Sequence, residues 1–172
     1  MPIENFIRLV RANCQQRTFF HFTANENVAS IREHGLLSMA ELRQRRLRHV
    51  AGGNALSQEL DARTGMDRYV HLCFRKKHGM AHQAIEERRV SELAWFSILP
   101  EVVKTPGTMV TLDNAVARDV QAIPISQALA HMDLDVLYTR TDWADAAIQD
   151  RLRRAERYEL LIPTRIPPAY IQ

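Results

Sequence analysis

The sequence has few cysteines, few glycines and no glycine-rich phosphate-binding motif. Only 2 of its 172 residues are cysteines, which excludes a disulfide framework and fits a reducing compartment. Its 6 glycines form neither a P-loop nor the dinucleotide-binding fingerprint, so a nucleotide, if bound, must be held in another way. The nucleophile elbow G-x-S-x-G is also missing, which argues against a serine hydrolase.

The chain also lacks any segment typical of a membrane span or a secretory signal. Its longest apolar runs, such as LAWFSIL around Trp95, are far shorter than the roughly 20 residues of a membrane helix. The opening MPIEN has neither the basic nor the apolar region of a secretory signal. We therefore expect a cytoplasmic protein.

The composition is that of a soluble globular domain. Hydrophobic residues make up 46% of the chain and charged residues 25%, the balance typical of a protein with a packed core. A chain of 172 residues can bury most of its apolar surface in one core. We expect residues 1–172 to form a single domain.

Arginines gather in two stretches, although the formal net charge is only +3. Such clusters attract polyanions, nucleic acids among them. The alternative interpretation is a solvated helix face. The first stretch contains Arg43, Arg45, Arg46 and Arg48, and the second contains Arg151, Arg153, Arg154 and Arg157.

Hydrophobic spacing predicts helices and strands in irregular alternation. Thr23 with Glu26, and Ser38 with Glu41, have the spacing of capping boxes that begin helices, and Gly35 fits the residue that ends the first of these. The second helix should carry the first arginine cluster. Helices are further predicted at 3–14, 58–62, 79–89, 126–132 and 143–157, and strands at 19–22, 69–74, 93–99, 108–112 and 158–162.

Prolines at 163, 167 and 168 should end regular structure near the C-terminus. The strands are interspersed with short helices and lack regular βαβ spacing. This pattern favours an α+β fold around a small, split, mixed β-sheet.

A metal site deserves consideration because four potential ligands lie close in sequence. His71 and Cys73 share one face of a predicted strand, while His78 and His82 are four residues apart on a predicted helix. However, neither a CxxC pair nor an HExxH motif accompanies them. We expect no metal, and Cys73 should pack as a small hydrophobic residue rather than act as a nucleophile.

Three segments together carry a family resemblance. They are FFHFTANENVASIREHGLLS, LDARTGMDRYVHLCF, and DWAD followed by ERYELLIPTRIPPAYI. Their order and spacing resemble the DarT family of bacterial toxins, which are ADP-ribosyltransferases that modify bases in single-stranded DNA. The resemblance extends from residue 19 to 171 and implies an ADP-ribosyltransferase-like fold with NAD as co-substrate.

The resemblance also implies roles for individual residues. Glu159 corresponds to the catalytic glutamate of a late strand, and His21 to the histidine that anchors NAD. Arg63, with Arg68 as the alternative, corresponds to an arginine that holds substrate or cofactor. The other residues expected to bind the cofactor are Thr23, Asn27, Leu36, Tyr69 and Phe74, and those expected to bind nucleic acid are Arg45, Arg46, Arg48 and Arg154.

From residue patterns alone, several of these assignments have ordinary alternatives. His21 could be a hydrogen-bonded core histidine, and Glu159 could face solvent from a half-exposed strand. Tyr69 and Phe74 are candidates for stacking on nicotinamide or a base, but aromatic residues in strands more often belong to a core.

The mechanism implied by the resemblance is substitution at the nicotinamide ribose. Glu159 would stabilise oxocarbenium-like charge and take the proton of the attacking base nitrogen. The base must be unstacked to reach the site, which favours single-stranded DNA. The resemblance further implies a toxin, acting as a monomer, with an antitoxin whose macrodomain removes the ADP-ribose.

Two other functions remain open at this stage. One keeps the fold but changes the target, as in an RNA-modifying transferase or an RNA 2'-phosphotransferase relative. The other is a basic nucleic-acid-binding module without catalysis, in which Glu159 is only structural.

Overall fold

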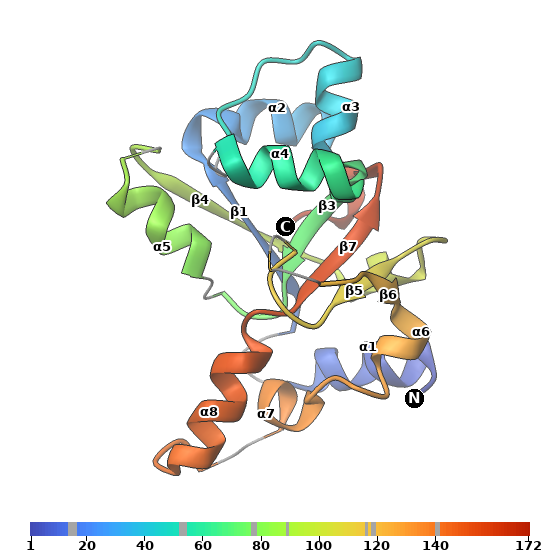
Figure 1. The fold of residues 1–172 in the computed structure, drawn as a ribbon. Coiled ribbons are helices and arrows are strands. Elements are labelled where there is room, and N and C mark those ends of the chain that lie inside the picture. Colours follow the sequence, from blue (N-terminus) through green and yellow to red (C-terminus); the bar gives the residue numbers. More distant parts are fainter. Residues whose placement is uncertain are drawn as a thin grey trace.

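The molecule is built around one six-stranded sheet (Figure 1). A computed structural model describes residues 1–13, 17–51, 55–76, 79–88, 90–115, 117, 120–139 and 142–172. The strand order is β4-β1-β3-β7-β5-β6, and a separate two-stranded sheet pairs β2 with β8. The strands are β1 (Phe19–Ala24), β2 (Leu36–Leu37), β3 (Tyr69–Cys73), β4 (Leu93–Ile98), β5 (Met109–Thr111), β6 (Ile123–Pro124), β7 (Glu159–Pro163) and β8 (Arg165–Ile166).

Helices lie at both ends of this sheet. In Figure 1, α2, α3 and α4 gather at one end, while α1, α6, α7 and α8 lie at the other. No helix within the described ranges has the length and apolar character needed to cross a membrane. The α-helices are α1 (Ile3–Ala12), α2 (Val28–His34), α3 (Met39–Gln44), α4 (Ala55–Thr64), α5 (Gly79–Glu86), α6 (Ile125–Ala128), α7 (Leu134–Tyr138) and α8 (Ala146–Ala155), and the 3-10 helices are η1 (Asn25–Asn27), η2 (Met66–Arg68), η3 (Pro100–Lys104) and η4 (Pro168–Tyr170).

The predicted α+β class is confirmed, but the sheet is not mixed. Each strand pair in the described part of the chain is antiparallel. Antiparallel neighbours need no crossover helix between them, which explains why regular βαβ spacing is missing from the sequence.

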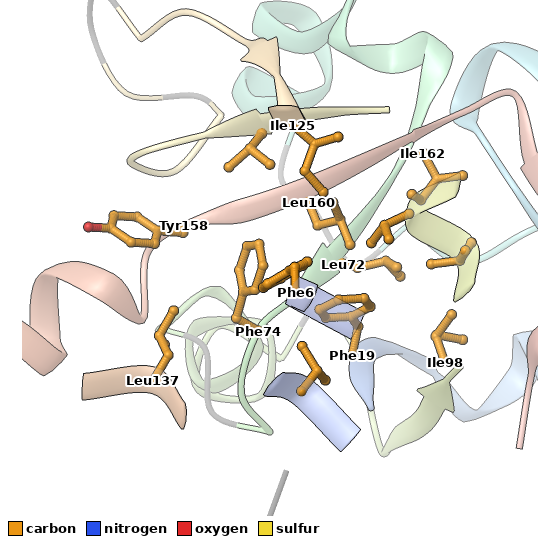
Figure 2. Close-up of a cluster of buried hydrophobic side chains, with 14 of the residues drawn as sticks. Phe6, Phe19, Leu72, Phe74, Ile98, Ile125, Leu137, Tyr158, Leu160 and Ile162 are labelled. Atoms are coloured by element: carbon orange, nitrogen blue, oxygen red, sulfur yellow. The ribbon is translucent and has the colours of Figure 1, made fainter. Parts of the chain in front are cut away.

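One face of the sheet packs on α1 and forms the main core (Figure 2). Phe6 of α1 stacks on Phe19 with ring centroids 6.0 Å apart, and Phe19 meets Phe74 edge-on at 5.6 Å. Leu72 and Leu160 are fully buried on the same face. Because side chains alternate along a strand, the residues between these core positions face the opposite side of the sheet.

The sheet is open between β1 and β3. These two strands pair only at Phe20 and Cys73, whereas β1 pairs with β4 along its whole length. Beyond this single pair, β1 and β3 diverge toward the end of the sheet covered by α2 and α4 (Figure 1). The predicted split of the sheet is thus present, and it leaves room for a cavity.

Two of the three predicted helix signals are confirmed. The Ser38 hydroxyl accepts a hydrogen bond from the Glu41 amide and caps α3, and Gly35 ends α2 with a φ of 81°. The Thr23 prediction is wrong, because β1 continues through Ala24 and the Thr23 hydroxyl instead accepts from the Asn27 amide at 2.9 Å.

Most predicted elements are present with shifted ends. The helix predicted at 58–62 is longer and spans Ala55–Thr64, while the one predicted at 143–157 is shorter and spans Ala146–Ala155. Regular structure does not end at Pro163, because β8 follows and pairs with β2. The last residue of the helix predicted at 3–14, and His78 of the zinc hypothesis, lie outside the described residues.

Candidate active site

A cavity of about 220 Å³ lies where β1 and β3 diverge. Its lining comes from the strands β1, β3 and β7, from α2, α3 and α4, and from the loop that follows α3. His21 of β1 and Glu159 of β7 both line it. The two residues implied by the family resemblance therefore share one cavity, although 138 positions separate them in the sequence (159 − 21).

Glu159 is a buried carboxylate at the start of β7. Its exposed fraction is 5%, because β3 and β5 flank it, with Cys73 and Thr111 as its partners in register. The His71 Nδ1 lies 2.7 Å from Oε2, and the Ala115 amide donates to Oε1 at 2.9 Å. Buried charges need such partners, so this carboxylate is held in a fixed orientation at the cavity.

His71 is one of the groups that hold the Glu159 carboxylate. It occupies the same face of β3 as Cys73, diagonally across from Glu159, and its Nε2 lies 3.1 Å from the Met66 carbonyl oxygen. Burial opposes its protonation, but the hydrogen bond and negative charge of Glu159, together with the charge of Asp61, outweigh burial and raise the pKa of His71 to about 9.

His21 bridges the open part of the sheet. Its Nδ1 lies 2.9 Å from the His71 carbonyl oxygen, and because a carbonyl can only accept, Nδ1 carries the proton. Burial lowers the pKa of His21 to about 4, and the charge on His71 acts in the same direction. His21 is therefore neutral, with Nε2 as a hydrogen-bond acceptor.

Asp61 and Cys73 also line the cavity, and both have shifted pKa values. Burial raises the pKa of Asp61 on α4, with the charge of His71 opposing and the charge of Glu159 adding to that shift. Its Oδ1 is buried and has no hydrogen-bond partner among the described residues. Burial, reinforced by Glu159, also raises the pKa of the Cys73 thiol, so Cys73 stays protonated and is not an activated nucleophile.

Asn27 anchors the loop that closes one side of the cavity. Its Nδ2 donates to the Val50 carbonyl at 2.8 Å and its Oδ1 accepts from the Val50 amide at 2.9 Å. The same Nδ2 donates to the Thr23 hydroxyl. Asn27 and Thr23 both line the cavity, but the Asn27 amide is used to hold the loop that carries Arg48.

Arg48 is the arginine that lines the cavity. It is exposed, and no acidic partner for it is found in the described part of the chain. Arg63 on α4 and Arg68 in η2 are also exposed, but neither is among the lining residues. The prediction of Arg63 or Arg68 as the arginine of the cavity is therefore not supported by their positions.

The predicted aromatic and apolar contacts divide between the two faces of the sheet. Tyr69 and Leu36 line the cavity. Phe74 does not line it. It is two residues after Leu72, so both side chains face the core, and Phe74 is buried there with an exposed fraction of 1%. Tyr69 and Phe74 are five residues apart, so in a regular strand they cannot face the same side.

The two arginine clusters lie in different places, and both contain ion pairs. In the first cluster, Arg43 pairs with Asp67 and Arg45 with Glu41. Arg45 and Arg46 follow α3, close to Arg48, and not within one helix as predicted, because α3 ends at Gln44 and Arg46 has a φ of 55°. Arg154 lies on α8, at the other end of the molecule (Figure 1). Within the described ranges, the two clusters thus lie at opposite ends of the molecule, and the cavity lies at the end of the first cluster.

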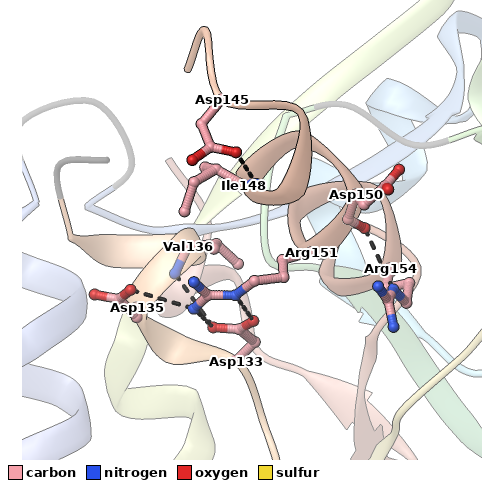
Figure 3. Close-up of polar contacts among 8 residues, drawn as sticks. All are labelled: Asp133, Asp135, Val136, Asp145, Ile148, Asp150, Arg151 and Arg154. Carbon is pink, nitrogen blue, oxygen red and sulfur yellow. Dashed lines mark hydrogen bonds and ion pairs between the residues drawn. The ribbon is translucent and has the colours of Figure 1, made fainter. Parts of the chain in front are cut away.

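The second cluster is engaged in local contacts (Figure 3). Arg151 donates to both carboxylate oxygens of Asp133 at 2.7 and 2.8 Å and to Asp135 at 3.2 Å. The Arg154 Nε donates to the backbone carbonyl of Asp150. The Arg151 contacts tie α8 to the start of α7, and the Arg154 contact lies within α8.

Of the four residues considered for zinc, His71 and Cys73 lie on β3 and His82 lies on α5, while His78 is outside the described residues. Among the described residues, no group of three or more histidine, cysteine, aspartate or glutamate side chains could hold a metal ion. His71 pairs with Glu159, while His82 is exposed on α5 and pairs with Glu86 at 3.1 Å.

Sequence reasoning missed His71 and Asp61 as parts of this site. A signal for His71 existed, since it shares the parity of Cys73 in a strand that antiparallel pairing sets beside the glutamate strand. No comparable signal exists for Asp61, which reaches the cavity only because α4 packs over the open part of the sheet.

The sequence model of one protein family, described as "DarT: ssDNA thymidine ADP-ribosyltransferase", matches residues 20–172. The chain belongs to the DarT family. The resemblance stated from the sequence is therefore confirmed, and membership makes NAD-dependent ADP-ribosylation of single-stranded DNA the activity of its family. Among curated proteins, no match to the chain was found.

Solved structures of DarT proteins share the fold. DarTG of Thermosipho africanus in complex with ADP-ribose superposes with a TM-score of 0.68 at 18% identity, over 90% of this chain and 42% of that one. DarT of Thermus sp. 2.9 in complex with ADP-ribosylated ssDNA gives a TM-score of 0.66 at 19% identity, over 89% and 78%. The same protein in complex with NAD+ gives 0.59 at 18%, over 90% and 78%.

At identities of 18% and 19%, these comparisons show that the fold is shared. The chain spans less than half of the Thermosipho DarTG chain, and it covers 78% of the Thermus DarT chain. The α+β architecture with its open six-stranded sheet is thus the DarT architecture.

Proposed function

We propose that the cavity binds NAD and that the protein transfers ADP-ribose to a thymidine base of single-stranded DNA. The family description names this reaction, and DarT structures contain NAD+ and ADP-ribosylated ssDNA. One observation carries the proposal for this chain. A buried carboxylate, Glu159, is held by His71 and the Ala115 amide on the same cavity that His21 lines.

In the proposed reaction, the bond between C1' of the ribose and the nicotinamide nitrogen breaks, and its electron pair leaves with nicotinamide. Positive charge develops at C1', and the nearby Glu159 carboxylate stabilises it. The base nitrogen then forms a bond to C1' and loses its proton to Glu159. Since both steps depend on alignment, the fixed orientation of Glu159 contributes to the rate.

The neighbouring residues have distinct proposed roles in binding. The His21 Nε2 accepts a hydrogen bond from a ribose hydroxyl of NAD, because Nδ1 is already engaged with the His71 carbonyl. Arg48 binds the pyrophosphate, since a guanidinium can pair with phosphate oxygens in a bidentate way. Tyr69 and Leu36 supply apolar contact surface at the same cavity.

The exposed arginines outside the cavity are proposed to bind the DNA backbone. Arg45 and Arg46 follow α3 on the side of Arg48, and Arg63 is exposed on α4, which also lines the cavity. Phosphate contacts of this kind make affinity fall with salt. Arg154 is left out of this surface, because it lies on α8 at the far end of the molecule.

The decisive experiment uses Glu159→Gln, which keeps the size and shape of the side chain and removes its charge. We expect the variant to bind NAD but to transfer labelled ADP-ribose to a thymidine-containing oligonucleotide at least about 100-fold more slowly, the usual scale for losing an electrostatic catalytic group. Undiminished transfer by this variant would exclude Glu159 as the catalytic carboxylate.

Matched substrates separate the proposed reaction from its rivals. Single-stranded DNA with thymidine, the same strand without thymidine, and RNA of equal sequence should be compared, and mass spectrometry of the product should identify the modified base. Transfer to RNA alone would favour the RNA-modifying alternative, and binding of DNA without any transfer would favour a non-catalytic module.

We also propose a monomeric, cytoplasmic toxin that is opposed by an antitoxin with a macrodomain. The neighbour described as DarTG supports a partner of this kind. The proposal predicts that growth arrest caused by expression of the chain depends on Glu159 and is reversed by an enzyme that removes ADP-ribose from DNA. Size-exclusion chromatography with light scattering tests the monomer.

A further inference from the structure

The His71 ring is hydrogen-bonded at both nitrogens to groups that accept. Its Nε2 faces the Met66 carbonyl oxygen at 3.1 Å, and its Nδ1 faces Glu159 Oε2 at 2.7 Å. A carbonyl oxygen cannot donate, so Nε2 must carry a proton. The proton between Nδ1 and Oε2 therefore decides the charge of the pair.

That single proton has two possible positions. If it lies on Nδ1, the pair is an imidazolium beside a carboxylate, and if it lies on Oε2, both groups are neutral. If it is lost, the Nδ1 lone pair faces the negative Oε2 and the two atoms repel each other. The geometry of the pair therefore requires this proton.

We infer that His71 is a positioning residue, which orients the Glu159 carboxylate for the reaction through a proton that the two side chains share. The inference rests on the proposed role of Glu159. It goes beyond that role, because it makes the competence of the glutamate depend on the protonation of a second residue on a different strand.

The groups around His71 favour protonation of its ring at Nδ1. Glu159 of β7 and Asp61 of α4 are both acidic and act on it from two elements. His21 of β1, which contacts the His71 carbonyl, is neutral. On β3 itself, Cys73 stays protonated.

Tyr69, on the same face of β3, also lines the cavity, and Asp67 of η2 lines it while paired with Arg43. Asp67 adds a further negative charge near Asp61. Two cations lie nearby: Arg43, which is paired with Asp67, and Arg48, which lines the cavity from the loop after α3. The negative charges that act on the His71 ring are those of Glu159 and Asp61, and they support its charged form.

The inference predicts a pH dependence that a purely structural histidine would not produce. With its pKa raised to about 9, His71 should hold the proton at neutral pH and lose it in alkaline solution. Above that pH the Oε2 atom of Glu159 loses its hydrogen bond to His71, and the carboxylate is less firmly oriented. The kcat for ADP-ribose transfer should then fall, while the KM for NAD changes little.

The test variant is His71→Asn, because the asparagine amide nitrogen lies near the position of Nδ1 and can donate to Glu159 without a titratable charge. We expect kcat at neutral pH to fall by about 10- to 100-fold, the scale of one charge-assisted hydrogen bond. The remaining activity should show no decline as pH rises through about 9.

The matched control is His82→Asn. His82 also pairs with a glutamate, Glu86, at 3.1 Å, but both side chains are exposed on α5. The same substitution there should leave kcat, KM and the pH profile unchanged. An alkaline decline that persists in His71→Asn would overturn the inference.

A second measurement does not depend on catalysis. In the 15N NMR spectrum, His71 of the wild type should be doubly protonated at pH 8, and in Glu159→Gln its pKa should drop below 6.5, because burial remains after the carboxylate has gone. Equal His71 titration in the two proteins would refute the shared proton. If the wild type lacks transfer activity, the proposed function fails, and this titration still decides the inference.

Discussion

His21 and His71 are neighbours with different protonation states: the His21 ring is neutral and the His71 ring is charged at neutral pH. A hydrogen bond joins the His21 ring to the His71 backbone carbonyl. Burial is the largest influence on both rings. It lowers the pKa of His21 to about 4, whereas at His71 the hydrogen bond and charge of Glu159, together with Asp61 and the Met66 carbonyl, outweigh burial and raise the pKa to about 9. One histidine is thus suited to accept a hydrogen bond, and the other to orient a carboxylate.

A prediction at this scale concerns His21→Asn. The asparagine amide can still donate to the His71 carbonyl, as Nδ1 does, but it has no acceptor where Nε2 lies. NAD binding measured by isothermal titration calorimetry should weaken by about tenfold, the scale of one hydrogen bond to a ligand. Thermal stability should change little, because the bond across the open sheet is kept. Wild-type affinity in this variant would rule out Nε2 as an NAD contact.

At the scale of elements, the turn after α2 leaves no room for a side chain at the wall of the cavity. Gly35 ends α2 with a φ of 81°, and a Cβ there would lie 2.2 Å from the Ile166 carbonyl oxygen. The clash is with backbone of β8, which pairs with β2, so neither partner can move without breaking that pairing.

Gly35→Ala should therefore lower the free energy of unfolding by more than about 2 kcal/mol, since the left-handed backbone and the clash both oppose a side chain. Gly65 is the matched control, because its φ of 75° is similar but nothing lies within 4 Å of a Cβ. Gly65→Ala should lose only about 1 kcal/mol. Urea denaturation of both variants tests this, and equal losses would show that the clash has no effect.

At the scale of the whole molecule, the two histidines give global stability a maximum near pH 6.5. From pH 6.5 down to about 4, the unfolded chain binds a proton at His21 that the folded protein excludes, so stability falls as pH falls. From pH 6.5 up to about 9, the folded protein binds a proton at His71 that the unfolded chain lacks, so stability falls as pH rises.

The free energy of unfolding should fall by at most about 3 kcal/mol on each side of pH 6.5. Urea unfolding at pH 4.5, 6.5 and 8.5 measures it, with buffers matched in ionic strength. His71→Asn should flatten the alkaline side and leave the acid side unchanged. A wild type whose stability rises steadily from pH 6.5 to 9 would contradict the charge state assigned to His71.

Much of the local structure could be predicted, because it depends on interactions within a few residues. The capping hydroxyl of Ser38 and the positive φ of Gly35 are local properties, and both are confirmed. Thr23 has the same capping signature, yet it lies in β1, because pairing with β4 continues through Ala24. Tertiary strand pairing overrides a local signal there.

Positions within the site could be predicted only where the family resemblance supplied them. His21 and Glu159 line one cavity, as the resemblance implies, but Phe74 and Arg63 lie away from it. For Phe74 the parity of β3 decides, and this required knowing which face packs on α1. For Arg63 the direction in which α4 crosses the sheet decides, and no spacing in the sequence encodes it.

The sequence by itself determined the family, the α+β class and most helix and strand positions, since these depend on residue order and periodicity along the chain. Only the tertiary structure decided that His71 pairs with Glu159, that Asp61 joins them and that Arg48 lines the cavity. The physical reason is that burial and charge at these side chains come from neighbours on other strands and helices. Their protonation and roles are therefore properties of the assembled sheet rather than of any one segment.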